Sequence, residues 1–218
     1  MRLLVVNPNT SDGVTSAIAR AARAAAGPGD VVDAVSAPFG PELIVTEEDG
    51  AVAEGAVLAC VEARGAGYDG IVIASFGDTA IDAVRERVRV PVVGIARAAF
   101  LAAMAVGERF SIVSFSPDVA PSMHAIVARY GLGERLASLR VLEGAYEGDP
   151  ARIGEALVEP LAELCAQAQA DGGAAIVLGG GPLAGLSAAI APRLRIPVID
   201  GVVAAVALQR ALVTPRPG

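Results

Sequence analysis

Aromatic and basic side chains are scarce in this sequence. Only 4% of the 218 residues are aromatic, tryptophan is absent, and 17 Lys and Arg stand against 24 Asp and Glu, a formal net charge of −7. A protein that binds nucleic acid presents a basic patch to the phosphates, and no long basic run is present here. We therefore expect no nucleic-acid partner.

Cysteines and long apolar runs are scarce too. Cys60 and Cys165 are too few for a disulfide framework or a zinc site, and both lie on apolar helical stripes typical of small core residues. No segment approaches the roughly 18 apolar residues of a membrane span, and the apolar run in MRLLVVNPNT is too short for a signal peptide. We expect a cytoplasmic protein that does not bind membranes.

Short runs of Val, Ile and Leu alternate with Ala-rich helical stretches in a chain that is 54% hydrophobic. Near-continuous apolar runs are typical of strands covered on both faces, and their alternation with helices predicts an α/β fold with parallel sheets. The predicted strands are Leu3–Asn7, Val31–Ala37, Gly70–Ser75, Pro91–Ile95, Ser111–Phe115, Leu139–Gly144, Ala174–Gly179 and Pro197–Gly201.

The two halves of the sequence resemble each other. IVIASFGDTAIDAVRERVRVPVVG at 71–94 aligns with IVLGGGPLAGLSAAIAPRLRIPVIDG at 176–201, and RLLVVNPNT aligns with RFSIVSFSP. This repeat predicts two Rossmann-like lobes, each with a four-stranded parallel sheet, related by pseudo-twofold symmetry. We place them at 1–96 and 97–202, with a helix at about 203–218 packing back on the first lobe. Ligands bind outside the carboxyl ends of such strands, so we expect a cleft between the lobes.

Two polar motifs follow predicted strands in the first half. In NPNTS, Asn9 and Thr10 either cap the next helix or help to bind a carboxylate. In SFGDT, Ser75 is an N-cap, an anion-binding group or a nucleophile, and Asp78 is the nearest acid and a candidate cap of the same helix. A nucleophilic serine needs a base, and nothing places the one histidine, His124, beside Ser75.

The glycine-rich stretch LGGGPLAG at 178–185 also leads into a helix. It is either a glycine turn with no binding role or a loop whose backbone N–H groups approach an anion. It lacks the Lys-Ser/Thr of a P-loop and the spacing of a dinucleotide site, so we expect no nucleotide cofactor.

Taken together, these segments resemble the aspartate/glutamate/hydantoin racemase family nearly end to end. The resemblance depends on NPNTS, SFGDTAIDAVRE, VPVVGIARAAF, RFSIVSFS, YGL at Tyr130, DGGAAIVLGGGPLAGL and IPVIDGV. It implies two lobes with a site between them, no organic cofactor or metal ion, a small carboxylate or amide substrate, and a homo-oligomer. Racemases of this family use one cysteine from each lobe as acid and base, whereas related arylmalonate decarboxylases keep only the second; maleate isomerases also belong to the family.

Both catalytic cysteines of the family are replaced here. The first falls on Ser75 and the second on Gly180, and Val45 stands where the family has a glutamate. A thiol with a pKa of about 8.5 exchanges protons near neutral pH, whereas a serine hydroxyl without a partner does not, and glycine has no side chain. The two-thiol mechanism therefore cannot operate.

We expect a cofactor-independent enzyme of the racemase family that uses carbanion or enolate chemistry without the thiol pair. A decarboxylase-like or lyase-like relative and a non-catalytic binding protein are the alternatives. Ser75 and Asp78 are the candidate catalytic residues; Ser116, His124, Tyr146 and Asp200 are further candidates for the missing acid or base. The candidate substrate-binding residues are Asn9, Thr10, Phe76, Gly77, Ser114, Gly180 and Gly181, and no metal ligands are expected.

Overall fold

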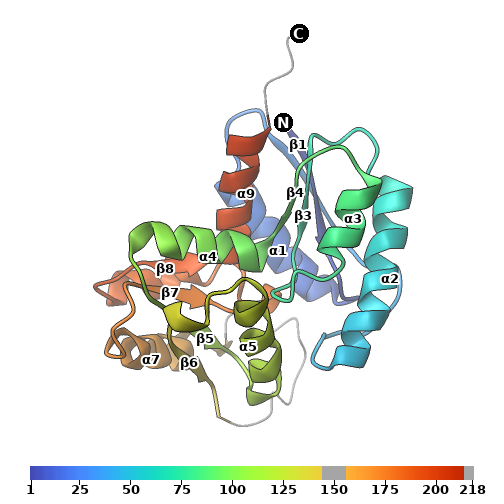
Figure 1. The fold of residues 1–218 in the computed structure, drawn as a ribbon. Coiled ribbons are helices and arrows are strands. Elements are labelled where there is room, and N and C mark those ends of the chain that lie inside the picture. The colour runs from blue at the N-terminus through green and yellow to red at the C-terminus, as the bar shows by residue number, and fades with distance from the viewer. Residues whose placement is uncertain (144–155, 214–218) are drawn as a thin grey trace.

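Two four-stranded parallel sheets form the fold in a computed structural model that describes residues 1–143 and 156–213 (Figure 1). The strand orders are β2-β1-β3-β4 and β6-β5-β7-β8, so the two sheets repeat one topology. The α/β architecture with two parallel sheets is thereby confirmed. The strands are β1 (Arg2–Asn7), β2 (Val31–Ser36), β3 (Gly70–Ile73), β4 (Val92–Gly94), β5 (Phe110–Ser114), β6 (Leu136–Val141), β7 (Ala175–Leu178) and β8 (Val198–Asp200).

Helices cover both faces of the first sheet, which explains its continuous apolar strands. Along β1, Leu3 and Val5 pack toward α1 (Asp12–Ala25) and α9 (Gly201–Leu212), while Leu4 and Val6 pack toward α2 (Glu47–Arg64) and α3 (Ile81–Arg87). Successive side chains of a strand point to opposite faces, so a strand buried on both faces has no polar alternation. The remaining α-helices of the described residues are α4 (Ile95–Val106), α5 (Ala120–Arg129), α7 (Val158–Gln169) and α8 (Ser187–Ile190).

The helix that follows the last strand of each sheet packs against the other sheet. Helix α4 follows β4 of the first sheet but contacts β7 and β8 of the second. Helix α9 follows β8 of the second sheet but contacts β3 and β4 of the first (Figure 1). The buried Gln209 of α9 fixes this position, because its Nε2 donates to the carbonyl oxygens of Ile71 at 2.7 Å and Pro91 at 3.1 Å.

The sixth strand lies three residues earlier than predicted, at Leu136–Val141, and the predicted end at Gly144 falls outside the described residues. β6 is an edge strand whose residues are all partly exposed. Such a strand can include polar residues, which interrupt its apolar run. Ser138 donates to Ser111 Oγ at 3.0 Å, and Arg140 forms an ion pair with Asp171 at 2.6 Å. The continuous apolar run therefore predicts this strand too late in the sequence.

No helix of the described residues is long and apolar enough to cross a membrane.

Candidate active site

A cavity of about 830 Å³ lies between the lobes, at the carboxyl ends of the strands. It takes residues from the loops after β1 and β3 in the first lobe and from those after β5 and β7 in the second. Six of the predicted site residues line this cavity: Asn9, Ser75, Phe76, Gly77, Gly180 and Gly181. The repeat therefore places polar loops of both halves around one space.

Asn9 presents hydrogen-bond donors to the cavity. Its Oδ1 accepts from the Asn7 side chain at 2.7 Å and from the backbone N–H of Ser11 at 3.0 Å. Because a backbone N–H can only donate, the Ser11 contact fixes which end of the amide is the oxygen. The Nδ2 group of Asn9 donates to no other described residue, although Asn9 is only 6% exposed. It is therefore available to a ligand oxygen.

Ser75 and Thr79 form a hydroxyl pair in the cavity wall. Their oxygens lie 2.9 Å apart, and the Gly77 N–H donates to Ser75 Oγ at 3.3 Å. Both side chains are partly exposed, and both residues line the cavity. Ser75 can donate its proton to a ligand while it accepts from Gly77, so it has the geometry of a binding group.

Backbone N–H groups add further donors on both sides. The hydrogen bonds among the described residues leave the N–H groups of Ser75, Phe76, Gly180 and Gly181 unused. N–H groups that converge at strand ends stabilise negative charge on a ligand oxygen. Residues with unused N–H groups thus line the cavity from both lobes.

Two predicted binding residues lie outside the cavity lining. The Thr10 hydroxyl donates to the Pro41 carbonyl at 3.2 Å, and the buried Ser114 hydroxyl donates to the Gly179 carbonyl at 2.6 Å. Both hydroxyl groups link neighbouring segments, so they support the walls of the cavity without lining it.

The further candidates for an acid or base that belong to the described residues also lie outside the cavity lining. His124 is exposed on α5 and contacts the Ala120 carbonyl, and Ser116 caps the turn at Pro117–Val119. Asp200 caps α9, accepting from the N–H groups of Val202 and Val203. Tyr146 lies outside the described residues.

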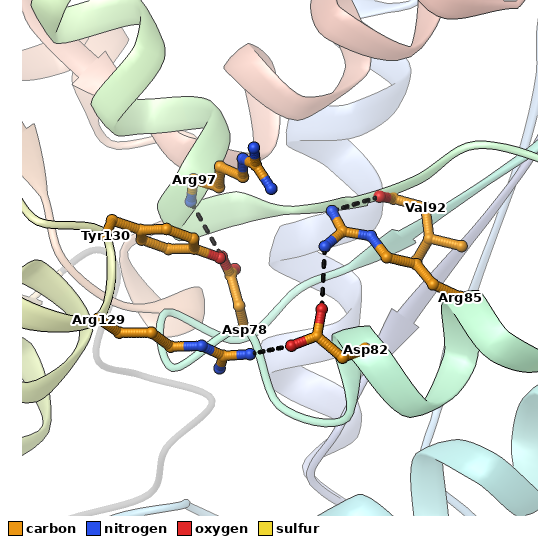
Figure 2. A network of polar contacts seen from close by, with 7 residues as sticks. All are labelled: Asp78, Asp82, Arg85, Val92, Arg97, Arg129 and Tyr130. Carbon is orange, nitrogen blue, oxygen red and sulfur yellow. Dashed lines mark hydrogen bonds and ion pairs between the residues drawn. The ribbon is translucent and has the colours of Figure 1, made fainter.

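Asp78 is buried outside the cavity lining, and its carboxylate binds the start of α4 (Figure 2). Its carboxylate accepts from the N–H groups of Ala96 and Arg97, each at 3.0 Å, and from the Tyr130 hydroxyl at 2.6 Å. The predicted cap of the next helix is wrong, because α3 follows Ala80 and has no side-chain cap. Burial raises the pKa of the Asp78 carboxyl, and the three donors oppose that rise.

Asp78 and Ala80 adopt left-handed backbone conformations, with φ of 47° and 60°. Such conformations cost about 1 to 3 kcal/mol each in residues other than glycine and persist where the surroundings enforce them. The contacts of the Asp78 carboxylate with α4 and with Tyr130 of the second lobe supply that enforcement. They therefore hold the Ser75–Thr79 loop in its conformation.

Three charged residues of the cavity lining were not predicted from the sequence as site residues: Glu47, Asp118 and Arg129. Arg129 forms an ion pair across the lobes with Asp82 at 2.6 Å, and Asp82 also binds Arg85 (Figure 2). Glu47 begins α2 after a capping box in which Thr46 and Asp49 bind each other's backbone. The T-E-E-D pattern predicts the start of a helix. It does not indicate that the first turn of this helix lies beside the cavity at the strand ends.

Cys60 and Cys165 are buried in α2 and α7, outside the cavity lining. Burial raises the pKa of both thiols, that of Cys165 to about 12. Since the thiolate is the reactive species, neither cysteine supplies an acid or base near neutral pH.

We expect both native thiols to resist a colorimetric disulfide reagent at pH 8 and to react only on denaturation. The burial that raises their pKa also excludes the reagent. The measurement is thiol titration over time, with and without urea, and the control is the same protein unfolded from the start. Rapid reaction of one thiol in the native protein would contradict the burial described here.

Within residues 1–143 and 156–213, no three His, Cys, Asp or Glu side chains gather as a possible metal site.

Comparison with known proteins gives one consistent result. The family model described as Asp/Glu/Hydantoin racemase matches residues 3–209. A hydantoin racemase from Paenarthrobacter aurescens is 36% identical over 98% of this chain and 91% of its own length. An allantoin racemase from Klebsiella pneumoniae is 40% identical, with a TM-score of 0.91 over 98% of this chain and 87% of that one. An allantoin racemase from Pseudomonas fluorescens is 33% identical, with a TM-score of 0.86 over 100% and 98%.

Proposed function

Because the chain belongs to the Asp/Glu/hydantoin racemase family, we propose that it catalyses proton transfer at the acidic carbon beside a carbonyl group, with no metal ion, organic cofactor or thiol. The substrate is a small carboxylate or cyclic amide. One observation carries this proposal: residues of both lobes that have unused hydrogen-bond donors line the cavity, while both cysteines are buried outside it.

The donors act on the charge that develops during the reaction. When the C–H bond breaks, its electron pair moves into the enolate, whose oxygen becomes negative. The Nδ2 of Asn9, the Ser75 hydroxyl and the unused N–H groups at the strand ends stabilise that oxygen. Asp78 acts as a positioning residue for the Ser75 loop and does not contact the substrate.

A carboxylate replaces the thiol as the proton acceptor. Glu47 and Asp118 are the acidic residues among the described lining of the cavity, one from each lobe. An ionised carboxylate is a far better proton acceptor than a neutral serine hydroxyl. The proton that leaves carbon is bound by one of these carboxylates and returns to carbon or passes to solvent.

Decarboxylation is the alternative, because it needs proton transfer on one face only, although Gly180 replaces the second-lobe cysteine that the family's decarboxylases keep. In that reaction a C–C bond breaks, CO₂ leaves, the electron pair enters the same enolate, and one proton is added to carbon. A single proton donor is then sufficient.

The test is proton NMR in D₂O with the wild-type protein and a panel of amino acids, hydantoins, allantoin and substituted malonates. We expect loss of the α-proton signal as deuterium replaces it. Loss of CO₂ would indicate the decarboxylase alternative. Ligand-induced shifts of protein signals without exchange or product would indicate a binding protein.

We expect Ser75→Ala to lower kcat/KM for that exchange by at least about tenfold, since loss of one oxyanion donor typically costs about 10²-fold or more. Ser16→Ala, on the exposed face of α1, is the matched control and should leave the rate unchanged. An unchanged rate for Ser75→Ala would remove Ser75 from the mechanism.

A further inference from the structure

The second-lobe wall of the cavity has no space for a side chain at its centre. Gly180 has φ of +139°, a conformation that residues with a Cβ rarely adopt. A Cβ on Gly180 would lie 2.9 Å from Phe115 Cε1 and 3.4 Å from its Cδ1. A Cβ on Gly181 would lie 2.9 Å from the Ala74 carbonyl oxygen. Backbone conformation and steric contact thus both oppose side chains here.

The ring of Phe115 is fixed in this position. It follows β5, is 4% exposed, and belongs to the core of the second lobe together with Met123 and Leu183. Close-packed side chains do not yield space without a loss of stability. Phe115 therefore occupies the space that a side chain at 180 would need.

The first-lobe wall differs. A Cβ on Gly77 would meet only the hydroxyl oxygens of Ser75 and Thr79, both at an ordinary 3.7 Å. This side has side chains with exchangeable protons and space around them. The two strand ends, which the repeat makes equivalent, are thus chemically different.

We infer that Phe115 is a specificity-determining residue that makes proton transfer at this site one-sided, so that substrate keeps its configuration. This inference rests on the proposed function. The C–H bond breaks toward the first lobe, its electron pair enters the enolate, and the proton is bound by the Glu47 carboxylate, the first-lobe acid of the cavity lining. Reprotonation re-forms the C–H bond on the same face.

Asp118, the second-lobe acid of the cavity lining, does not lie at the strand end that corresponds to Ser75. It lies in the turn at Pro117–Val119, where its Oδ2 accepts from the Ser116 hydroxyl at 3.1 Å, and not at the end of β7. At the end of β7, Gly180 and Gly181 therefore offer backbone N–H groups and no side-chain acid, with the Phe115 ring beside them.

A stability experiment tests the role of Phe115 without any substrate. Gly180→Ala should lower the melting temperature by several degrees in the wild-type background and by clearly less with Phe115→Leu, which removes Cε1, the atom nearest the new Cβ. Gly77→Ala is the matched control and should change the melting temperature little in either background. An equal loss for Gly180→Ala in both backgrounds would overturn the assignment of Phe115.

A stereochemical experiment tests the one-sided transfer. A single enantiomer of a substrate that exchanges is incubated in D₂O, and exchange is followed by NMR and configuration by chiral chromatography, with enzyme-free samples subtracted. We expect at least tenfold more exchange than inversion. Equal rates would overturn the inference while leaving the proposed function intact. No exchange with any compound of the panel would instead remove the proposed function, and the melting experiment would still decide the role of Phe115.

Discussion

Asp78→Ala is expected to lower the free energy of unfolding by about 3 kcal/mol, one of the largest losses available to a single substitution in this protein. The change deprives the N–H groups of Ala96 and Arg97 and the Tyr130 hydroxyl of their acceptor. An N-cap is worth about 0.5 to 2 kcal/mol, and each buried donor left unpaired adds about 1 to 3 kcal/mol, with incomplete additivity. Urea denaturation followed by circular dichroism measures the loss.

Two variants calibrate that result. Asp82→Ala, four residues further on, removes an exposed carboxylate whose ion pairs are worth about 1 kcal/mol or less. Asp78→Asn keeps one acceptor oxygen and should fall between the two. A loss for Asp78→Ala no larger than that for Asp82→Ala would show that the cap of α4 contributes little.

Gly94→Asp is expected to destabilise the wild-type protein by a similar amount and to rescue Asp78→Ala. A Cβ on Gly94 would overlap the Asp78 carboxylate, so the single variant displaces the cap. Position 94 is equivalent in the repeat to Asp200, which caps α9 from its own strand end. The backbone already has the required conformation: φ and ψ are −91° and 148° at Gly94, and −94° and 124° at Asp200.

The double variant should recover at least half of the loss seen with Asp78→Ala alone. This is a coupling of roughly 3 kcal/mol or more in a double-mutant cycle. Asp78→Ala removes the carboxylate that a side chain at 94 would overlap, and Gly94→Asp supplies a new acceptor for the N–H groups of α4. Gly94→Ala with Asp78→Ala is the matched control, since it relieves the overlap without supplying a carboxylate. Equal stability of this control and the Gly94→Asp double variant would show that an aspartate at 94 cannot cap α4.

The strands and the strand-end residues of the site could be predicted because their signals are local. Each buried strand is a short apolar run, and Asn9, Ser75 and Gly180 follow such runs directly. The repeat then placed the two ends opposite each other. The position of β6 could not be found in the same way, because an edge strand includes polar residues such as Ser138 and Arg140.

The role of Asp78 could not be predicted because its partners are remote in sequence. Local rules assign an acid in SFGDT to the next helix, whereas Ala96 and Tyr130 lie 18 and 52 residues away. The same limit applies to Glu47 and Asp118, which reach the cavity only through the packing of α2 and of the turn after β5. The steric conflict of Gly180 with Phe115 also requires coordinates.

The exchange of α4 and α9 between the sheets invites comparison with a symmetric dimer of two half-length chains. Two copies of a half-length chain with this topology would complete each other as a twofold homodimer, each giving its last helix to its partner, with the cavity on the symmetry axis. Such a dimer presents the same residue from both copies. It cannot place a hydroxyl on one side of a ligand and a closed wall on the other. A single chain that carries both halves is free of that constraint, so it can place Ser75 on one side of the cavity and Gly180 on the other.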